Sequence, residues 1–303
     1  MDKQAAAAEH EKPLWRRVVD FPIVAMLIAA ALFIVAAGIG QAIGTAIPLH
    51  SSLLRMLVHN GLILTLVLLA YKLAITRLGE HPHDDLSRKR ALPDLGIGIL
   101  IGFAIMALSV GAAAIADIYN ITGGGDSSQL VHELVTSAIM PAFLEEILFR
   151  GILFRWLEEF AGSFVALVLT AAMFGASHLM NPNATPVAAF GIAIEAGVLL
   201  GGAYMLTRSL WLPIGLHAAW NFTQGEIFDV PVSGLDEHGL VQAKLSGPAL
   251  LSGGGFGLEA SLFAMVIATT AGIWLVCLAI KRGELVKPWW VRRRASVTPA
   301  GKA

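Results

Sequence analysis

The chain has 303 residues, of which 56% are hydrophobic and only 14% are charged, and its formal net charge is −1. Because soluble domains carry about 25% charged residues, this composition excludes an ordinary soluble protein and predicts a multi-pass integral membrane protein. A single cysteine, Cys277, excludes a disulfide framework and a zinc site built from cysteines.

Eight apolar segments are long enough to cross a membrane as helices, which takes about 20 residues each. They cover residues 21–43, 52–75, 95–118, 130–157, 163–180, 186–206, 209–228 and 258–280. The first exceeds the core of about 7–15 residues that is typical of a signal peptide, so we interpret it as an uncleaved helix. We predict an all-α transmembrane bundle that forms one integral-membrane domain over residues 1–303, with tails at 1–20 and 281–303.

The connections between these segments differ in composition. The second and third spans are joined by a basic loop that includes Arg88 and Arg90, and residues 120–128 predict a short exposed turn. Residues 229–256 predict a loop rich in Gly and Ser. Arg155 and Glu158 are typical of a solvated helix end. The third span is rich in Gly and Ala, which favours close helix packing.

The basic residues predict the orientation of the bundle. Counting helix ends with their loops, 19 of the 21 Lys and Arg residues fall on the side of the two termini, which leaves Arg55 and Lys244 for the other side. The positive-inside rule therefore places both termini in the cytoplasm. No nucleic-acid signature is visible, and the basic tail is more simply an orientation and lipid-surface signal.

Charged side chains in the fourth span are the first candidates for chemistry. Charges inside a membrane helix cost about 2.5 kcal/mol or more each, so they face the protein interior and usually mark function. Glu146 and Arg150 stand at i and i+4 and can form an ion pair. Glu145 lies about 100° around the helix from Glu146 and is free for another task.

Two further motifs follow in later spans. The fifth span ends in Phe174-x-x-x-His178, and the seventh contains His217-x-x-x-Asn221, whose side chains share a helical face. Because each of these polar groups is costly in a membrane without a partner, we expect one polar cavity shared by spans four, five and seven. Glu195 in the sixth span has no assigned role. We expect this intramembrane site to open to the cytoplasm.

In this order, the three motifs resemble the family of intramembrane proteases that includes the type II CAAX prenyl proteases and the bacteriocin-processing or self-immunity proteins of the Abi group. The resemblance covers about residues 130–225, which would form the protease core. It implies hydrolysis of a peptide bond in or beside the membrane. It also implies a peptide or protein substrate, which the sequence does not identify and which includes lipidated proteins among the candidates, and contact with membrane lipids.

The chemistry of the motif residues agrees with this activity. Glu145 can act as a general base on a water molecule held by His178, and His217 and Asn221 can donate hydrogen bonds to the oxyanion. Glu146 and Arg150 would support the helix that carries the base. Zinc is an alternative, since Glu145, His178 and His217 offer it a carboxylate and two nitrogens. We favour a metal-free, glutamate-based site.

Two other classes of function also place polar residues in a membrane bundle. A proton-coupled transporter would do so, although the chain shows neither repeated halves nor paired broken helices. A non-catalytic scaffold or immunity protein would not need all four polar groups. We therefore favour the protease.

Overall fold

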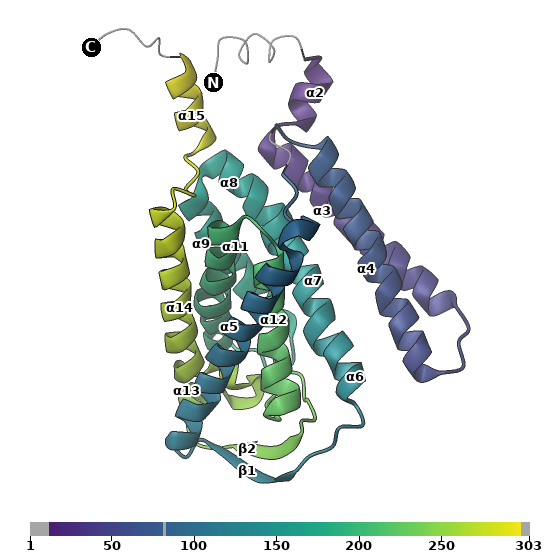
Figure 1. The fold of residues 1–303 in the computed structure, drawn as a ribbon, viewed down its shortest axis with the longest axis vertical. Coiled ribbons are helices and arrows are strands. Elements are labelled where there is room, and N and C mark those ends of the chain that lie inside the picture. The colour runs from purple at the N-terminus through teal and green to yellow at the C-terminus, as the bar shows by residue number, and fades with distance from the viewer. Residues whose placement is uncertain (1–11, 81–82, 298–303) are drawn as a thin grey trace.

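A computed structural model describes residues 12–80 and 83–297, so residues 1–11 and 298–303 of the expected tails lie outside the described part. The described chain is mostly helical, as predicted (Figure 1). Its helices before the fourth expected span are α2 (Leu14–Val19), α3 (Pro22–Ala46), α4 (Ser52–Arg77) and α5 (Arg88–Ile115). The remaining long helices are α9 (Ser163–Ser177), α11 (Val198–Thr207), α12 (Trp211–Phe222), α14 (Leu262–Lys281) and α15 (Trp289–Val297).

Within the described residues, six helices are long and apolar enough to span a membrane. They are Pro22–Ala46, Ser52–Arg77, Arg88–Ile115, Ser163–Met180, Pro186–Thr207 and Leu262–Lys281. The third begins earlier than predicted, because Arg88 to Arg90 belong to the helix and not to a loop. The other two predicted spans, residues 130–157 and 209–228, are also helical, but neither contains a single helix long and apolar enough to be counted with these six.

The fourth predicted span is a continuous helical path whose winding changes along its length. It runs through α6 (Leu130–Glu133), the π-helix η1 (Leu134–Ile139), α7 (Met140–Glu146), the π-helix η2 (Ile147–Phe154) and α8 (Arg155–Ala161). Pro141 stands at the start of α7, where its missing N–H interrupts the hydrogen bonds of the preceding turn. Single π-helical turns are frequent at functional sites. Here they flank the residues of the first motif.

The seventh predicted span consists of α12 and the π-helix η5 (Thr223–Ile227), and it packs closely on α5. A methyl group at Gly98 would lie 2.3 Å from the carbonyl oxygen of Leu212, and one at Gly102 would lie 2.2 Å from that of Leu216. Only glycine allows the two backbones to approach this closely. The small residues of the third span therefore bring α5 against the helix that carries His217 and Asn221, as the composition predicted.

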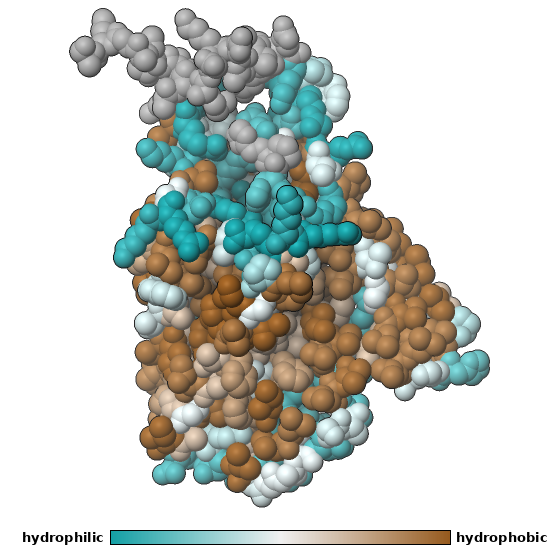
Figure 2. Space-filling model, in the orientation of Figure 1, coloured by the Kyte–Doolittle hydropathy of each residue, from teal (hydrophilic) through white to brown (hydrophobic). Residues whose placement is uncertain are grey.

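The helices form a bundle with one separate feature, the α3–α4 hairpin, which splays away at its far end (Figure 1). Helices α2 and α15 lie at the same end of the molecule, and the strands lie at the opposite end. A belt of hydrophobic side chains covers the middle of the visible face, with hydrophilic ones gathered toward the end of α2 and α15 (Figure 2). This is the surface expected of a membrane protein.

Two strands at the end opposite α2 and α15 correct the prediction of unstructured connections there. Strand β1 (Tyr119–Gly124) pairs antiparallel with β2 (Val241–Leu245), with a shift in register between Ile121 and Gly123. Residues 120–128 are therefore not a simple turn, and the segment 229–256 also contains the short helix α13 (Ala249–Ser252). The pairing joins segments more than 100 residues apart, which local sequence patterns do not reveal.

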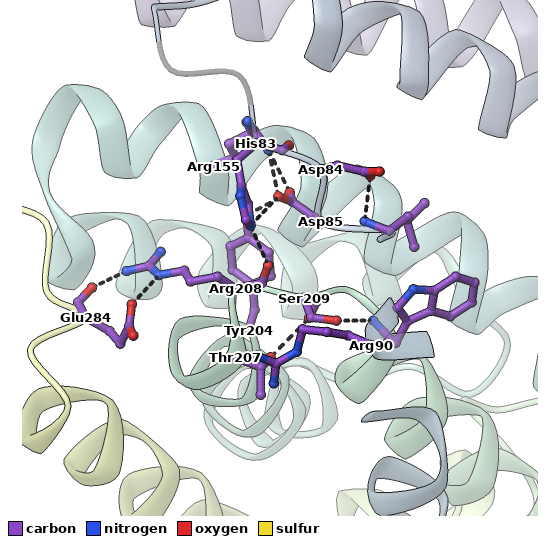
Figure 3. Close-up of polar contacts among 12 residues, drawn as sticks. His83, Asp84, Asp85, Arg90, Arg155, Tyr204, Thr207, Arg208, Ser209 and Glu284 are labelled. Carbon is purple, nitrogen blue, oxygen red and sulfur yellow. Dashed lines mark hydrogen bonds and ion pairs between the residues drawn. The ribbon is translucent and has the colours of Figure 1, made fainter. Parts of the chain in front are cut away.

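At the end of α2 and α15, the residues predicted to form a solvated helix end are instead part of a buried polar cluster (Figure 3). Asp85 is fully buried and accepts hydrogen bonds from Arg155 at 2.8 Å, Tyr71 at 2.8 Å and Tyr204 at 3.0 Å. Glu158 is also buried and forms an ion pair with Arg208. The segment before α5 is thereby tied to the bundle.

Candidate active site

The ion pair expected from the i and i+4 spacing in the fourth span is present in the structure. Arg150 donates to Glu146 at 2.8 Å, and the two side chains are 1% and 0% exposed. Arg150 also donates to the backbone carbonyl of Ala196 at 3.2 Å, and its guanidinium stacks over the ring of Phe174 at 4.6 Å. The pair therefore joins the first motif to the fifth and sixth spans.

His217 lies between the two glutamates of the first motif. Its Nδ1 is 3.0 Å from Oε1 of Glu146, the same oxygen that accepts from Arg150, and its Nε2 is 4.0 Å from Oε2 of Glu145. Because a carboxylate only accepts, Nδ1 of His217 carries the proton in this contact. Glu146 thus fixes the imidazole as well as pairing with Arg150, a contact that the sequence analysis did not foresee.

His178 is buried at the end of α9, in the short 3-10 helix η3 (His178–Met180). Its Nδ1 donates to the backbone carbonyl of Phe174 at 2.8 Å, which leaves Nε2 as a hydrogen-bond acceptor in the neutral ring. The Phe174 ring contacts both imidazoles, with centroids 4.8 Å from His178 and 6.2 Å from His217. This one aromatic side chain holds both histidines in place.

Asn221 is buried one helical turn after His217, on the same face of α12. Its side-chain amide donates to the backbone carbonyl of Ser137 in η1 at 2.9 Å. That bond fixes the plane of the amide and uses one of its two N–H groups. The second N–H is available to another acceptor.

A small cavity of about 30 Å³ joins two of the three motifs. Its polar lining consists of His178, Glu195, His217, Asn221, Ser233 and Glu259. A cavity of this size has room for one or two water molecules. Glu145 is not part of the lining and reaches the cavity only through His217, so the shared cavity differs from the predicted one in the position of the base.

Glu195 and Glu259 are the residues of this cavity that the sequence analysis did not assign. Glu195 lies in the π-helix η4 (Ala193–Gly197), is 1% exposed, and has no hydrogen-bond partner on either carboxylate oxygen. Glu259 precedes the membrane-spanning helix α14, accepts from the backbone N–H of Ser233, and has its pKa raised by burial to about 7. Glu195 could have been recognised as a candidate site residue, because it is an acid within an apolar segment. Glu259 stands at the edge of its apolar segment, so no sequence pattern gave a reason to select it.

Ser233 and Glu259 belong to the segment between η5 and α14, whose elements β2 and α13 lie at the end of the molecule opposite α2 and α15 (Figure 1). The cavity therefore reaches toward that end, whereas the sequence analysis expected it to open toward the end of the termini. That expectation did not include the polar segment after α12, which contributes Ser233 and Glu259 to the cavity.

A zinc site formed by Glu145, His178 and His217 requires their ligand atoms to converge. In the part of the chain that the structure describes, these three residues do not form a group whose potential ligand atoms all lie within 4.8 Å of one another. They do not fit a shared metal ion in this conformation, and we derive no reaction step through a metal.

Comparison with known proteins finds a family profile that matches the part of the chain with the three motifs. Residues 127–223, which contain all three motifs, match the profile described as Type II CAAX prenyl endopeptidase Rce1-like. Through this segment the chain resembles the Rce1-like type II CAAX prenyl endopeptidases. The α3–α4 hairpin, the two strands and α14 lie outside the matched Rce1-like segment.

A curated relative gives the same indication. The Bacillus subtilis (strain 168) protein named "Putative membrane peptidase YdiL" is 28% identical over 140 residues, which is 42% of this chain and 55% of the relative. The match thus spans about half of the relative's length. Its name agrees with the Rce1-like family and with the six candidate membrane helices.

Proposed function

We propose that the protein is an intramembrane endopeptidase that hydrolyses a peptide bond with water activated by Glu145 and His178. The observation that carries the proposal is the position of His217, which lies between the two glutamates of the first motif and lines the same cavity as His178 and Asn221. Three polar groups from two helical segments line that cavity, and Glu145 of a third segment approaches His217 from beside it.

The acceptor nitrogen of His178 and the carboxylate of Glu145 are the groups suited to take a proton from water. Glu145 is the more accessible of the two motif glutamates, with 32% of its side chain exposed, and one of its oxygens is buried without a partner. It lies 4.0 Å from Nε2 of His217, too far for a direct hydrogen bond but near enough for both groups to contact one water molecule.

His217 and Asn221 are suited to stabilise the oxyanion that forms when water attacks the carbonyl carbon. With Nδ1–H held by Glu146, the imidazolium form of His217 presents Nε2–H as a second donor. Asn221 contributes the amide N–H that Ser137 does not use. Because both side chains are fixed before the reaction, these donors need little reorganisation as the charge develops.

Glu146 and Arg150 would position the reacting groups without contacting the substrate. Their buried pair holds the His217 ring from one side, and the Phe174 ring under the guanidinium holds it from the other. Peptide or protein substrates, including lipidated ones, would approach from the surrounding membrane.

The experiment that tests this function compares the proteins of membranes containing the intact chain with those containing Glu145→Ala. We expect at least one membrane protein or peptide to be cleaved only with the intact chain. Cleavage of the same substrate by purified protein in liposomes, absent from the variant, would establish the activity as its own. An identical set of fragments in both membranes contradicts the proposal.

One observation favours a second candidate, proton-coupled transport. Glu195 is a buried acid without a hydrogen-bond partner, and burial raises the pKa of Glu259 in the same cavity to about 7. Buried acids of this kind carry protons in transporters. Proton uptake into liposomes that depends on Glu195, in a preparation without peptidase activity, would favour this alternative.

A further inference from the structure

Three carboxylates converge at a place separate from the candidate active site. Glu133 ends α6, Glu226 lies in η5, and Glu237 lies in the segment between η5 and β2. One carboxylate oxygen from each residue lies within 4.8 Å of the others. The three residues come from parts of the chain up to about 100 positions apart, so the fold alone brings them together.

Two of these carboxylates are buried with unpaired oxygens, and the third, Glu237, is half-buried. Glu226 is 1% exposed, and neither of its oxygens has a hydrogen-bond partner, although one of them lies within 4.8 Å of an oxygen of each of the other two acids. Glu133 is 8% exposed, and its Oε2 also has no partner. Among the described residues, no Lys or Arg forms an ion pair with any of the three. Buried like charges without a counter-charge are strongly unfavourable.

We propose that Glu133, Glu226 and Glu237 bind a hard divalent cation of the size of Ca²⁺. Oxygen ligands are what Ca²⁺ prefers, at about 2.3–2.6 Å, so that oxygens on opposite sides of one ion lie about 5 Å apart. The three oxygens lie within 4.8 Å of one another, close enough to contact one ion of this size. Mg²⁺ demands near-ideal octahedral geometry at about 2.0–2.1 Å and loses its waters reluctantly, so a site made of three carboxylates from separate segments suits it less well.

The cation would connect elements that form one side of the candidate active site. Glu226 follows Asn221 on the same helical path, and Glu237 interacts with the side chain of Ser137, whose carbonyl holds the Asn221 amide. An ion held by the three acids would fix α6 and η1 against η5 and the segment that follows it. Its main effect would therefore be on stability, with Asn221 held in place as a consequence.

The first test measures the thermal midpoint of the full-length, chelator-stripped protein in detergent, with CaCl₂, MgCl₂ or KCl at matched ionic strength. We expect saturating Ca²⁺ to raise the midpoint by about 5 °C relative to KCl, and by more than Mg²⁺ does. The rise should be lost in Glu226→Gln and in Glu237→Gln. Asp236→Asn, which changes an exposed acid beside Glu237, is the matched control and should respond as the parent does.

The second test counts bound ions by equilibrium dialysis with ⁴⁵Ca²⁺, which does not depend on melting. We expect one ion per chain in the parent and in Asp236→Asn, and at least tenfold weaker binding in Glu237→Gln. A parent that binds no ion overturns the proposal, and so does equal binding by all variants. The parent could bind no Ca²⁺ while Glu226→Gln has a higher thermal midpoint than the parent without added cation. That result would mean that the acids share protons and hold no metal, and it would overturn the proposal. A variant that loses Ca²⁺ binding but keeps peptidase activity, or one that keeps Ca²⁺ binding but loses peptidase activity, would show that the cation site and the proposed function are independent.

Discussion

Nδ1 of His217 lies 3.0 Å from Oε1 of Glu146, and this contact links the seventh span to the first motif. The same oxygen accepts from Arg150, so one buried carboxylate holds a cation on its own helix and an imidazole on another. Glu146 is thereby the residue that sets which nitrogen of His217 carries a proton, and Nε2 is left to face Glu145 and the cavity.

This contact predicts a combined defect in Glu146→Gln. The substitution keeps the size of the side chain but removes the charge that both His217 and Arg150 need. We expect peptide cleavage to fall by about 100-fold or more and the thermal midpoint to fall as well. Cleavage at the parent rate would show that the orientation of His217 by Glu146 has no part in the reaction.

Glu145→Gln should remove peptide cleavage while the protein still inserts and folds. Glu145 forms no ion pair closer than its 4.0 Å approach to His217, and its side chain is partly exposed, so the amide adds little strain. Cleavage in liposomes and the thermal midpoint are measured together, with Glu80→Gln on the surface as the control. Cleavage by the Gln variant at the parent rate would remove Glu145 from the mechanism.

Arg150→Ala and Asn221→Ala should separate support from chemistry. Losing Arg150 leaves Glu146 buried without its partner, which costs about 3–5 kcal/mol, so the midpoint and the yield should fall. Losing Asn221 removes one oxyanion donor, so turnover should fall by about 100–1,000-fold with a small change in stability. If Arg150→Ala melts like the parent yet is inactive, Arg150 belongs to the chemistry.

The polar cluster of Figure 3 predicts a large difference between two neighbouring aspartates. Asp85→Ala leaves Arg155 and two tyrosine hydroxyls without their buried acceptor, and we expect a loss of about 3–5 kcal/mol in stability. Asp84→Ala removes an exposed ion pair with Lys72, which contributes about 0–1 kcal/mol, and a hydrogen bond from the backbone N–H of Leu86, which contributes about 0.5–1.5 kcal/mol. Equal thermal midpoints for the two variants would contradict the role of Asp85.

The distribution of basic residues predicts opposite sides of the membrane for two exposed positions. With Cys277 replaced by Ala, a cysteine introduced at Lys89 should react with an impermeant thiol reagent only from the cytoplasmic side, and one at Asp236 only from the other side. Reaction of both from the same side would exclude the eight-span topology with cytoplasmic termini.

The sequence alone determined what depends on composition and on short spacing. Apolar length and scarce charge predicted a membrane bundle, and six of the predicted spans are helices fit to cross a membrane. The i and i+4 spacing predicted the Glu146–Arg150 pair, because helix geometry places those side chains together wherever the helix lies. The order of the three motifs indicated a resemblance to the type II CAAX prenyl proteases, and the segment that contains them matches the Rce1-like profile.

Only the tertiary structure decided which groups meet across the bundle. His217 reaches Glu146 over 71 positions, Glu195 and Glu259 join His178 at one cavity, and Glu133, Glu226 and Glu237 converge elsewhere. Each of these contacts depends on how closely the helices pack, where an α-helix changes to a π-helical turn, and how the polar segment after α12 folds back. Spacing within a helix is fixed by its own backbone, whereas contact between helices is set by the packing of all of them.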